Sequence, residues 1–196
     1  MLPTRRFSLT SGLKAMAVLL TSSLMLNATV PQGWYLAGSK PAEYESGVDA
    51  QVQYNAHPSA FLKSKSAVVN GFGTLMQDFR AEQYEGKRLR FTAFVKSEGV
   101  QDWAGLWMRV DKGRETVAFD NMQDRSIKGT NGWREYAIVL DVPQNATGIF
   151  FGVLLTGSGA VWMNSVKIEP VGPEVPITGS GMTQHRDRPT NLDFEN

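Results

Sequence analysis

Two tryptophans and an arginine alternate along one predicted strand, and their side-chain types suit the binding of a sugar. Over residues 103–111, Trp103, Trp107 and Arg109 share one face with Gly105, because successive side chains of a strand point to opposite faces. Aromatic rings stack on the C–H faces of sugars, and a guanidinium presents a planar fork of donors to hydroxyl or carboxylate oxygens. The segment therefore predicts a ligand-binding face.

Polar side chains after the following hairpin extend this predicted site. Residues 115–119 return as a strand, and residues 120–132 then read as a polar loop. Carboxylate and amide groups in this loop are suited to bind sugar hydroxyls. A structural Asp–Arg pair beside a turn is the alternative interpretation. The predicted ligand-binding residues are Trp103, Trp107, Arg109, Asp120, Asn121 and Arg125.

The sequence carries no recognisable catalytic motif. It contains neither G-x-S-x-G nor H-E-x-x-H, and Gly71-Phe72-Gly73 lacks the spacing of a nucleotide-binding loop. His57 and His185 are solitary. We expect a non-catalytic domain, and keep as an alternative an enzyme acting on polysaccharide through acids drawn from Asp111, Glu115 and Asp120.

No metal or cofactor is expected from the residue pattern. Glu43, Glu45 and Asp49, or the neighbourhood of Asn164, are the alternative for calcium. Their spacing differs from that of a calcium-binding EF-hand loop.

Composition limits the class of protein. The absence of cysteine excludes disulfides and thiolate metal sites, so an apolar core that draws on ten Phe and five Trp must stabilise the fold. Residues 1–28 hold three of the 20 basic residues and no acid, which leaves 17 basic against 19 acidic residues and a net charge of −2 in the rest. A near-neutral domain gives no electrostatic reason to expect a nucleic-acid partner.

Residues 1–28 read as an export signal. Arg5 and Arg6 precede an apolar stretch from Ala15 to Leu26, about the length of a signal-peptide core and short of the roughly 20 residues that span a bilayer. The paired arginines loosely match a twin-arginine signal, with an ordinary secretory signal or an uncleaved anchor as alternatives. The sequence thus predicts a periplasmic or secreted protein that meets the membrane only through this signal.

Residues 29–170 predict an all-β domain. Residues 133–142, 149–155 and 160–169 read as three consecutive strands, interpreted as an antiparallel meander that organises a β-sandwich. Residues 171–196 are rich in Pro and Gly and predict an extended tail, in which residues 191–195 are a candidate edge strand. Further strands are expected at 51–54, 60–65, 71–79, 87–97, 103–111 and 115–119.

Several segments resemble known families. GKRLRFTAFVKS (86–97) and the stretch from Trp133 to Glu169 resemble the second half of galactose-binding-like jelly rolls, the architecture of many carbohydrate-binding modules, although Asn164 stands where those domains carry an acid. GSKPAEYESGVD (38–49), WAGLWMRVD and FGVLLTGSGAVW resemble more closely a bacterial domain found alone or attached to AraC-type transcription regulators. This resemblance extends over about residues 34–169.

The resemblance implies a jelly-roll β-sandwich and a binding function. With the one-sided Trp/Arg strand, it predicts an exported domain whose ligand is a saccharide or similar polyol. A structural domain that binds an envelope protein is the alternative. The sequence shows no helix-turn-helix segment, so the family's link to regulators does not predict DNA binding here.

Overall fold

The computed structural model describes residues 29–179, and these contain strands and three short 3-10 helices but no α-helix. The predicted export signal, His185 and the candidate edge strand at 191–195 lie outside the described residues. No helix within 29–179 has the length and apolar character to cross a bilayer. The strands are β1 (Tyr35–Gly38), β2 (Tyr44–Tyr54), β3 (His57–Ser64), β4 (Phe72–Arg80), β5 (Arg88–Lys112), β6 (Glu115–Asp120), β7 (Ile127–Asp141), β8 (Gly148–Thr156) and β9 (Ala160–Val171). The helices are η1 (Pro41–Glu43), η2 (Glu82–Tyr84) and η3 (Gln123–Arg125).

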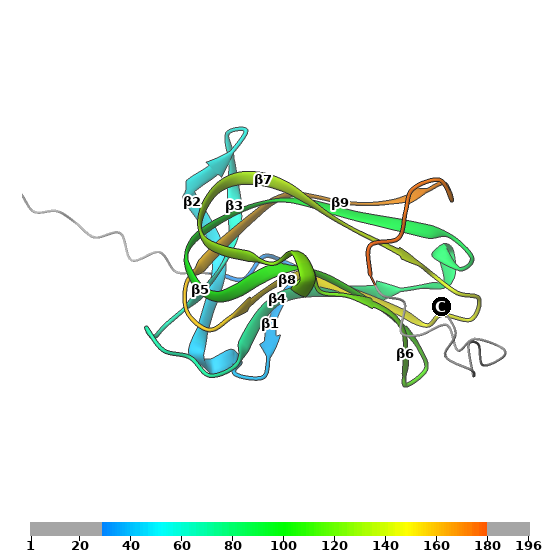
Figure 1. The fold of residues 1–196 in the computed structure, drawn as a ribbon, viewed down its shortest axis with the longest axis horizontal. Helices are drawn as coiled ribbons and strands as arrows, with labels where there is room; N and C mark the ends of the chain where they lie inside the picture. Colours follow the sequence, from blue (N-terminus) through cyan, green and yellow to red (C-terminus); the bar gives the residue numbers. More distant parts are fainter. Residues whose placement is uncertain (1–28, 180–196) are drawn as a thin grey trace, which may run out of the picture.

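The predicted antiparallel β-sandwich is confirmed, and its two layers share β5. The first half of β5 pairs with β7 and β9, whereas its second half pairs with β6 and β8. Strands β4 and β1 continue from β8, and β3 and β2 continue from β9. In Figure 1, β7 and β9 run through the upper layer, β4, β8 and β6 through the lower one, and β5 turns between them at the left.

The predicted meander is wrong. All three of its segments form strands, but β7, β8 and β9 each pair with β5 and not with one another. Alternation along a strand determines which side chains face the core, and it carries no information about the neighbouring strand. The organising element is therefore β5.

Strand β5 is one continuous element where the sequence predicted two. It runs for 25 residues, and its pairing with β7 shifts register between Val95 and Ala104. Gly99 lies within this stretch with a φ of +58°, a left-handed conformation that glycine adopts without steric cost. Such irregularities bend a strand and increase its twist, which allows β5 to leave one layer and enter the other.

Two strands begin earlier in the chain than expected. Strand β2 begins at Tyr44, ahead of the strand expected at 51–54, and β7 begins at Ile127, within the loop expected at 120–132. Both stretches are rich in polar residues, because a strand near the edge of a layer leaves many side chains in solvent.

Alternation along the strands places one face of each in the core. Leu89, Phe91, Ala93 and Val95 of β5 are at most 1% exposed, and Ile138, Leu140 and Val142 follow on β7 and just after it. The inward side chains of β8, which include Ile149 and Leu155, complete the main core between the layers.

Candidate functional site

A second apolar cluster lies on the face of the lower layer that points away from the main core. Met76, Trp107 and Leu154 are buried in this cluster, with Phe119 and Phe150 packed against them. The side chains come from β4, β5, β6 and β8, because alternation brings every second residue of each strand to this face.

This cluster surrounds a depression of about 380 Å³, which we call the apolar hollow. Its wall is mostly apolar, with aromatic side chains from three strands and a single charged side chain. The lining residues are Ala37, Gly38, Phe72, Thr74, Met76, Trp107, Arg109, Phe119 and Leu154.

Trp107 reaches across β8 to β4. Gly152 is paired with Trp107 on one side and with Met76 on the other, so the indole passes a position that has no side chain. The indole Nε1 donates to Thr74 Oγ1 at 2.7 Å, and this hydroxyl donates to the carbonyl of Val153 at 2.9 Å. Trp107 is only 7% exposed, so it forms part of the wall and its donor is already used.

Arg109 is held at the edge of the apolar hollow by two neighbours. Its guanidinium lies 4.4 Å from the ring centroid of Phe150, and Nη2 is 2.9 Å from Asp111 Oδ2. The Nε–H is buried and has no acceptor among the described residues. An unsatisfied buried donor is costly, so a ligand acceptor that drew the guanidinium into new hydrogen bonds would be favoured here.

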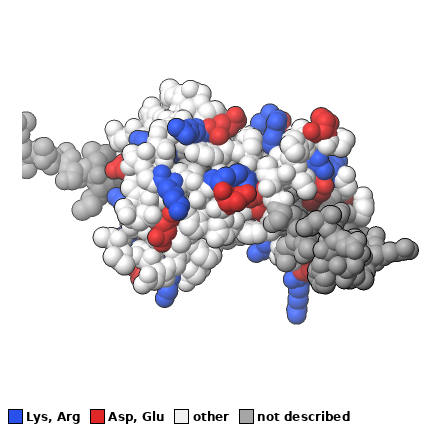
Figure 2. Space-filling model, viewed as in Figure 1, with Lys and Arg blue, Asp and Glu red and all other residues white. Residues whose placement is uncertain are grey.

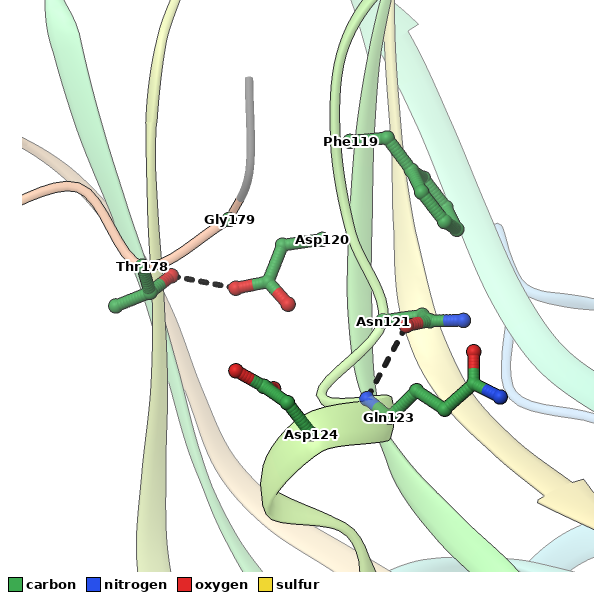
Figure 3. Close-up of a pocket in the computed structure, with 7 residues that line it drawn as sticks. All are labelled: Phe119, Asp120, Asn121, Gln123, Asp124, Thr178 and Gly179. Atoms are coloured by element: carbon green, nitrogen blue, oxygen red, sulfur yellow. Dashed lines mark hydrogen bonds between the residues drawn. The ribbon is translucent and has the colours of Figure 1, made fainter. Parts of the chain in front are cut away.

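A second, polar hollow of about 420 Å³ adjoins the first, and Phe119 lines both. In Figure 3 the side chains of Asn121 and Gln123 lie on the same side as Phe119, whereas Asp120 points toward Thr178. The side-chain nitrogens of Asn121 and Gln123 make no hydrogen bond with the described residues, while Asn121 Oδ1 accepts from the Gln123 N–H at 3.1 Å. The two amides therefore extend the apolar hollow with groups suited to hydroxyls.

Asp120 and Arg125 form the structural pair that the sequence left as an alternative. The Asp120 side chain is 4% exposed and accepts hydrogen bonds from Arg125, from the Met122 N–H at 2.8 Å and from the Thr178 hydroxyl. Burial alone would raise the pKa of Asp120, but these hydrogen bonds outweigh it and hold the pKa below its usual range. Because the carboxylate is fully engaged, we do not count Asp120 and Arg125 among the ligand contacts.

Trp103 is separated from the apolar hollow. The space beside Gly105 is filled, since a Cβ there would lie 3.0 Å from the Asn121 carbonyl oxygen and from Met122 Cβ. Met122 adopts a left-handed φ of +59°, which folds this segment over Gly105. Trp103 packs against the second cluster but lines neither hollow.

The structure thus brings Trp107, Arg109 and Asn121 to one face and adds residues that the sequence analysis missed. Phe72, Met76, Phe119 and Leu154 line the apolar hollow. A signal was present in the run Ile149–Leu155, which is apolar on both faces: the inward set builds the core, and Phe150 and Leu154 build the second cluster.

Three of the acids kept as alternatives, and Asn164, are bound to other protein groups. Asp111 pairs with Arg109, and Asp120 pairs with Arg125. Asp49 accepts from the Trp162 indole at 2.9 Å, and Asn164 Nδ2 donates to the carbonyl oxygens of residues 57 and 58. Within 29–179 no group of three or more His, Asp or Glu side chains is placed to hold a metal ion.

Basic and acidic side chains are interspersed over the surface, and some of them form ion pairs. Figure 2 shows basic and acidic groups next to one another on the face in view, with no broad area of a single sign. Arg88–Asp141 at 2.7 Å and Arg90–Glu169 at 2.5 Å are such pairs.

Comparison with known proteins gives one close relative in sequence. No family model matches the chain. It is 47% identical over 167 residues to the uncharacterized HTH-type transcriptional regulator YbfP of Bacillus subtilis (strain 168), a match that takes in 84% of this chain and 57% of that protein. The chain therefore spans somewhat more than half the length of this curated relative.

Solved structures show where the fold recurs. The CBM22-1 xylan-binding domain of Xyn10C from Paenibacillus barcinonensis superposes with a TM-score of 0.55 at 13% identity, over 72% of this chain and 88% of that one. The chain shares the β-sandwich fold of this module. The CBM22-1–GH10 modules of Clostridium thermocellum Xyn10B, complexed with xylohexaose, give a TM-score of 0.53 at 14% identity, over 71% of this chain and 26% of that one. The predicted resemblance to carbohydrate-binding modules is confirmed for the fold, and the relative in sequence is a transcriptional regulator by name.

Proposed function

We propose that this domain is a non-catalytic binding domain that holds a saccharide on the outer face of its lower layer. The observation that carries the proposal is the apolar hollow, in which Trp107, Phe72 and Phe119 surround a space edged by Arg109. The ligand contacts the aromatic wall through its C–H faces and reaches Arg109 and Asn121 through its hydroxyls.

The arrangement of polar groups favours a sugar over a wholly apolar ligand. The Nε–H of Arg109 at the edge of the hollow has no acceptor among the described residues, and the side-chain nitrogens of Asn121 and Gln123 lie beyond Phe119. A hydrocarbon would leave these groups without partners, whereas a sugar offers hydroxyls on its rim and C–H groups on its faces. The fold likeness to xylan-binding modules supports the same choice.

Isothermal titration calorimetry after a glycan-array screen tests the proposal. Arg109→Ala and Phe119→Ala are expected to weaken binding of the best array ligand by about tenfold or more, because each removes a contact of the hollow. Ala37→Phe fills the hollow from β1 and is expected to abolish binding while leaving the second cluster intact.

Phe94→Ala is the matched control. Phe94 stacks on Tyr54 at a centroid distance of 4.3 Å and lines neither hollow, so its loss is expected to leave affinity unchanged. The proposal fails if no saccharide binds, or if the three hollow variants bind as well as the native protein. The alternative, a structural domain that binds an envelope protein, would then be favoured.

We propose further that the chain is exported through residues 1–28. The support is the basic start followed by the short apolar stretch. The paired arginines loosely match a twin-arginine signal, and the ordinary secretory route is the alternative. In cell fractionation the protein is expected outside the cytoplasm, and a native protein found in the cytoplasm would contradict export. The double variant Arg5→Lys with Arg6→Lys separates the routes: retention inside the cell would indicate the twin-arginine route, and unchanged export the ordinary secretory one.

A further inference from the structure

We infer that the sugar held in the apolar hollow is uncharged, and that Asp111 and Asp78 discriminate against uronic acids and other anions. This inference rests on the proposed saccharide function. Its basis is the set of charges around Arg109, which would otherwise be a natural partner for a ligand carboxylate.

Asp111 already neutralises Arg109. Among the described residues that line the hollow, Arg109 is the one charged side chain, and its Nη2 lies 2.9 Å from Asp111 Oδ2. The second oxygen of Asp111 accepts from the Thr116 hydroxyl at 2.9 Å, and the side chain is 15% exposed. Asp111 is thus fixed beside the guanidinium by two contacts, and a carboxylate ligand would have to approach both charges together.

A second carboxylate lies across β8. Phe150 is paired with Arg109 on one side and with Asp78 on the other, so the three side chains occupy one row of the outer face. Asp78 accepts from the Tyr35 hydroxyl at 2.8 Å. Burial, together with Asp78, raises the pKa of Tyr35 to about 12, so the phenol stays protonated and does not add a charge. Arg109, Asp78 and Asp111 together therefore carry one negative charge, and Arg80 stands in the adjacent row, across Gly148 from Asp111.

The rest of the wall offers an anion no compensation. The Thr74 hydroxyl and the Trp107 indole are engaged with each other, and the remaining lining side chains are apolar. A carboxylate in this hollow would lose its hydration and meet a guanidinium that is already paired. A hydroxyl suits the same row, because it accepts from Arg109 and also donates a proton to a carboxylate oxygen.

The test compares each neutral sugar with its counterpart oxidised at C6, so that stereochemistry is held constant. Calorimetry at low ionic strength would use oligomers of glucose, galactose and mannose against those of glucuronate, galacturonate and mannuronate. In the pair that binds, the neutral member is expected to bind about tenfold more tightly or better. Added salt is expected to narrow the difference, because it screens the repulsion between the uronate and the two carboxylates.

Two variants test the origin of the discrimination. Asp111→Asn keeps the shape of the side chain and is expected to improve uronate affinity by about tenfold, with a smaller change for the neutral sugar. Asp78 does not contact the guanidinium, so Asp78→Asn is expected to improve uronate affinity by a smaller factor. The readout is the ratio of the uronate affinity to the affinity for the neutral sugar, because a loss of protein stability would weaken the binding of both ligands alike.

The outcomes separate the inference from the proposed function. Uronate binding that equals or exceeds binding of the neutral counterpart overturns the inference and leaves the saccharide function standing. An unchanged affinity ratio in both variants also overturns it. If no saccharide binds in the array or by calorimetry, both the inference and the proposed function are overturned.

Discussion

Replacing Gly152 by valine is expected to lower the free energy of unfolding by about 3 kcal/mol or to prevent folding. A Cβ at this position would lie 2.2 Å from the carbonyl oxygen of Leu75 and 2.9 Å from Met76 Cα. Both are backbone atoms of β4, so the clash is relieved only by separating β4 from β8. Urea denaturation followed by tryptophan fluorescence measures the effect.

Gly132→Val is the control for this substitution. Gly132 lies in β7, and a Cβ there would meet nothing within 4 Å. The change is expected to alter stability by no more than about 0.5 kcal/mol. A Gly152→Val protein with the native denaturation midpoint would show that β4 and β8 lie further apart than the structure indicates.

Replacing Asp120 by alanine is expected to lower the free energy of unfolding by about 2–3 kcal/mol at pH 7. The change removes the acceptor that Arg125, Thr178 and the Met122 N–H share in a nearly buried position. Asp141→Asn is the matched control: Asp141 pairs with Arg88, but its side chain is 57% exposed, so we expect a loss of at most about 1 kcal/mol.

The pH dependence of the Asp120 effect has a defined sign. The pKa of Asp120 is lowered in the folded state, so its contribution to stability is complete above the ordinary pKa of about 3.9 and disappears as the pH falls through the folded value. The stability difference between the native protein and Asp120→Asn is therefore expected to hold from pH 7 to 5 and to shrink below about pH 4. A difference that stays constant down to pH 2.5 would contradict the assignment.

Local patterns in the sequence predicted which residues face the core. Leu89 to Val95 and Ile138 to Val142 alternate as the structure shows, because burial of one strand face imposes a period of two. The same rule placed Trp103, Trp107 and Arg109 on one outward face. The order of the strands was not predictable in this way, since an alternating strand is compatible with several neighbours.

The candidate site was predicted only in part, because contacts between segments that are distant in the sequence build the rest of it. Trp107 and Arg109 were identified because they share a strand, but Phe72 and Leu154 reach the hollow from β4 and β8. Trp103 was placed beside Trp107 by spacing alone, and only the fold of Met122 over Gly105 separates them. Asp120 was read as a ligand contact because its partner Thr178 lies 58 residues away in a segment expected to be a free tail.

The position of β5 in the chain has a consequence for synthesis on the ribosome. Residues 88–112 emerge before all four of their partner strands, since β6, β7, β8 and β9 occupy residues 115–171. The upper layer is not closed until β9 is available, so the nascent chain carries an incompletely paired hydrophobic strand from residue 112 until synthesis has passed residue 171. Chaperone protection of that strand, more than the strength of the finished core, would then govern how much protein reaches the native state.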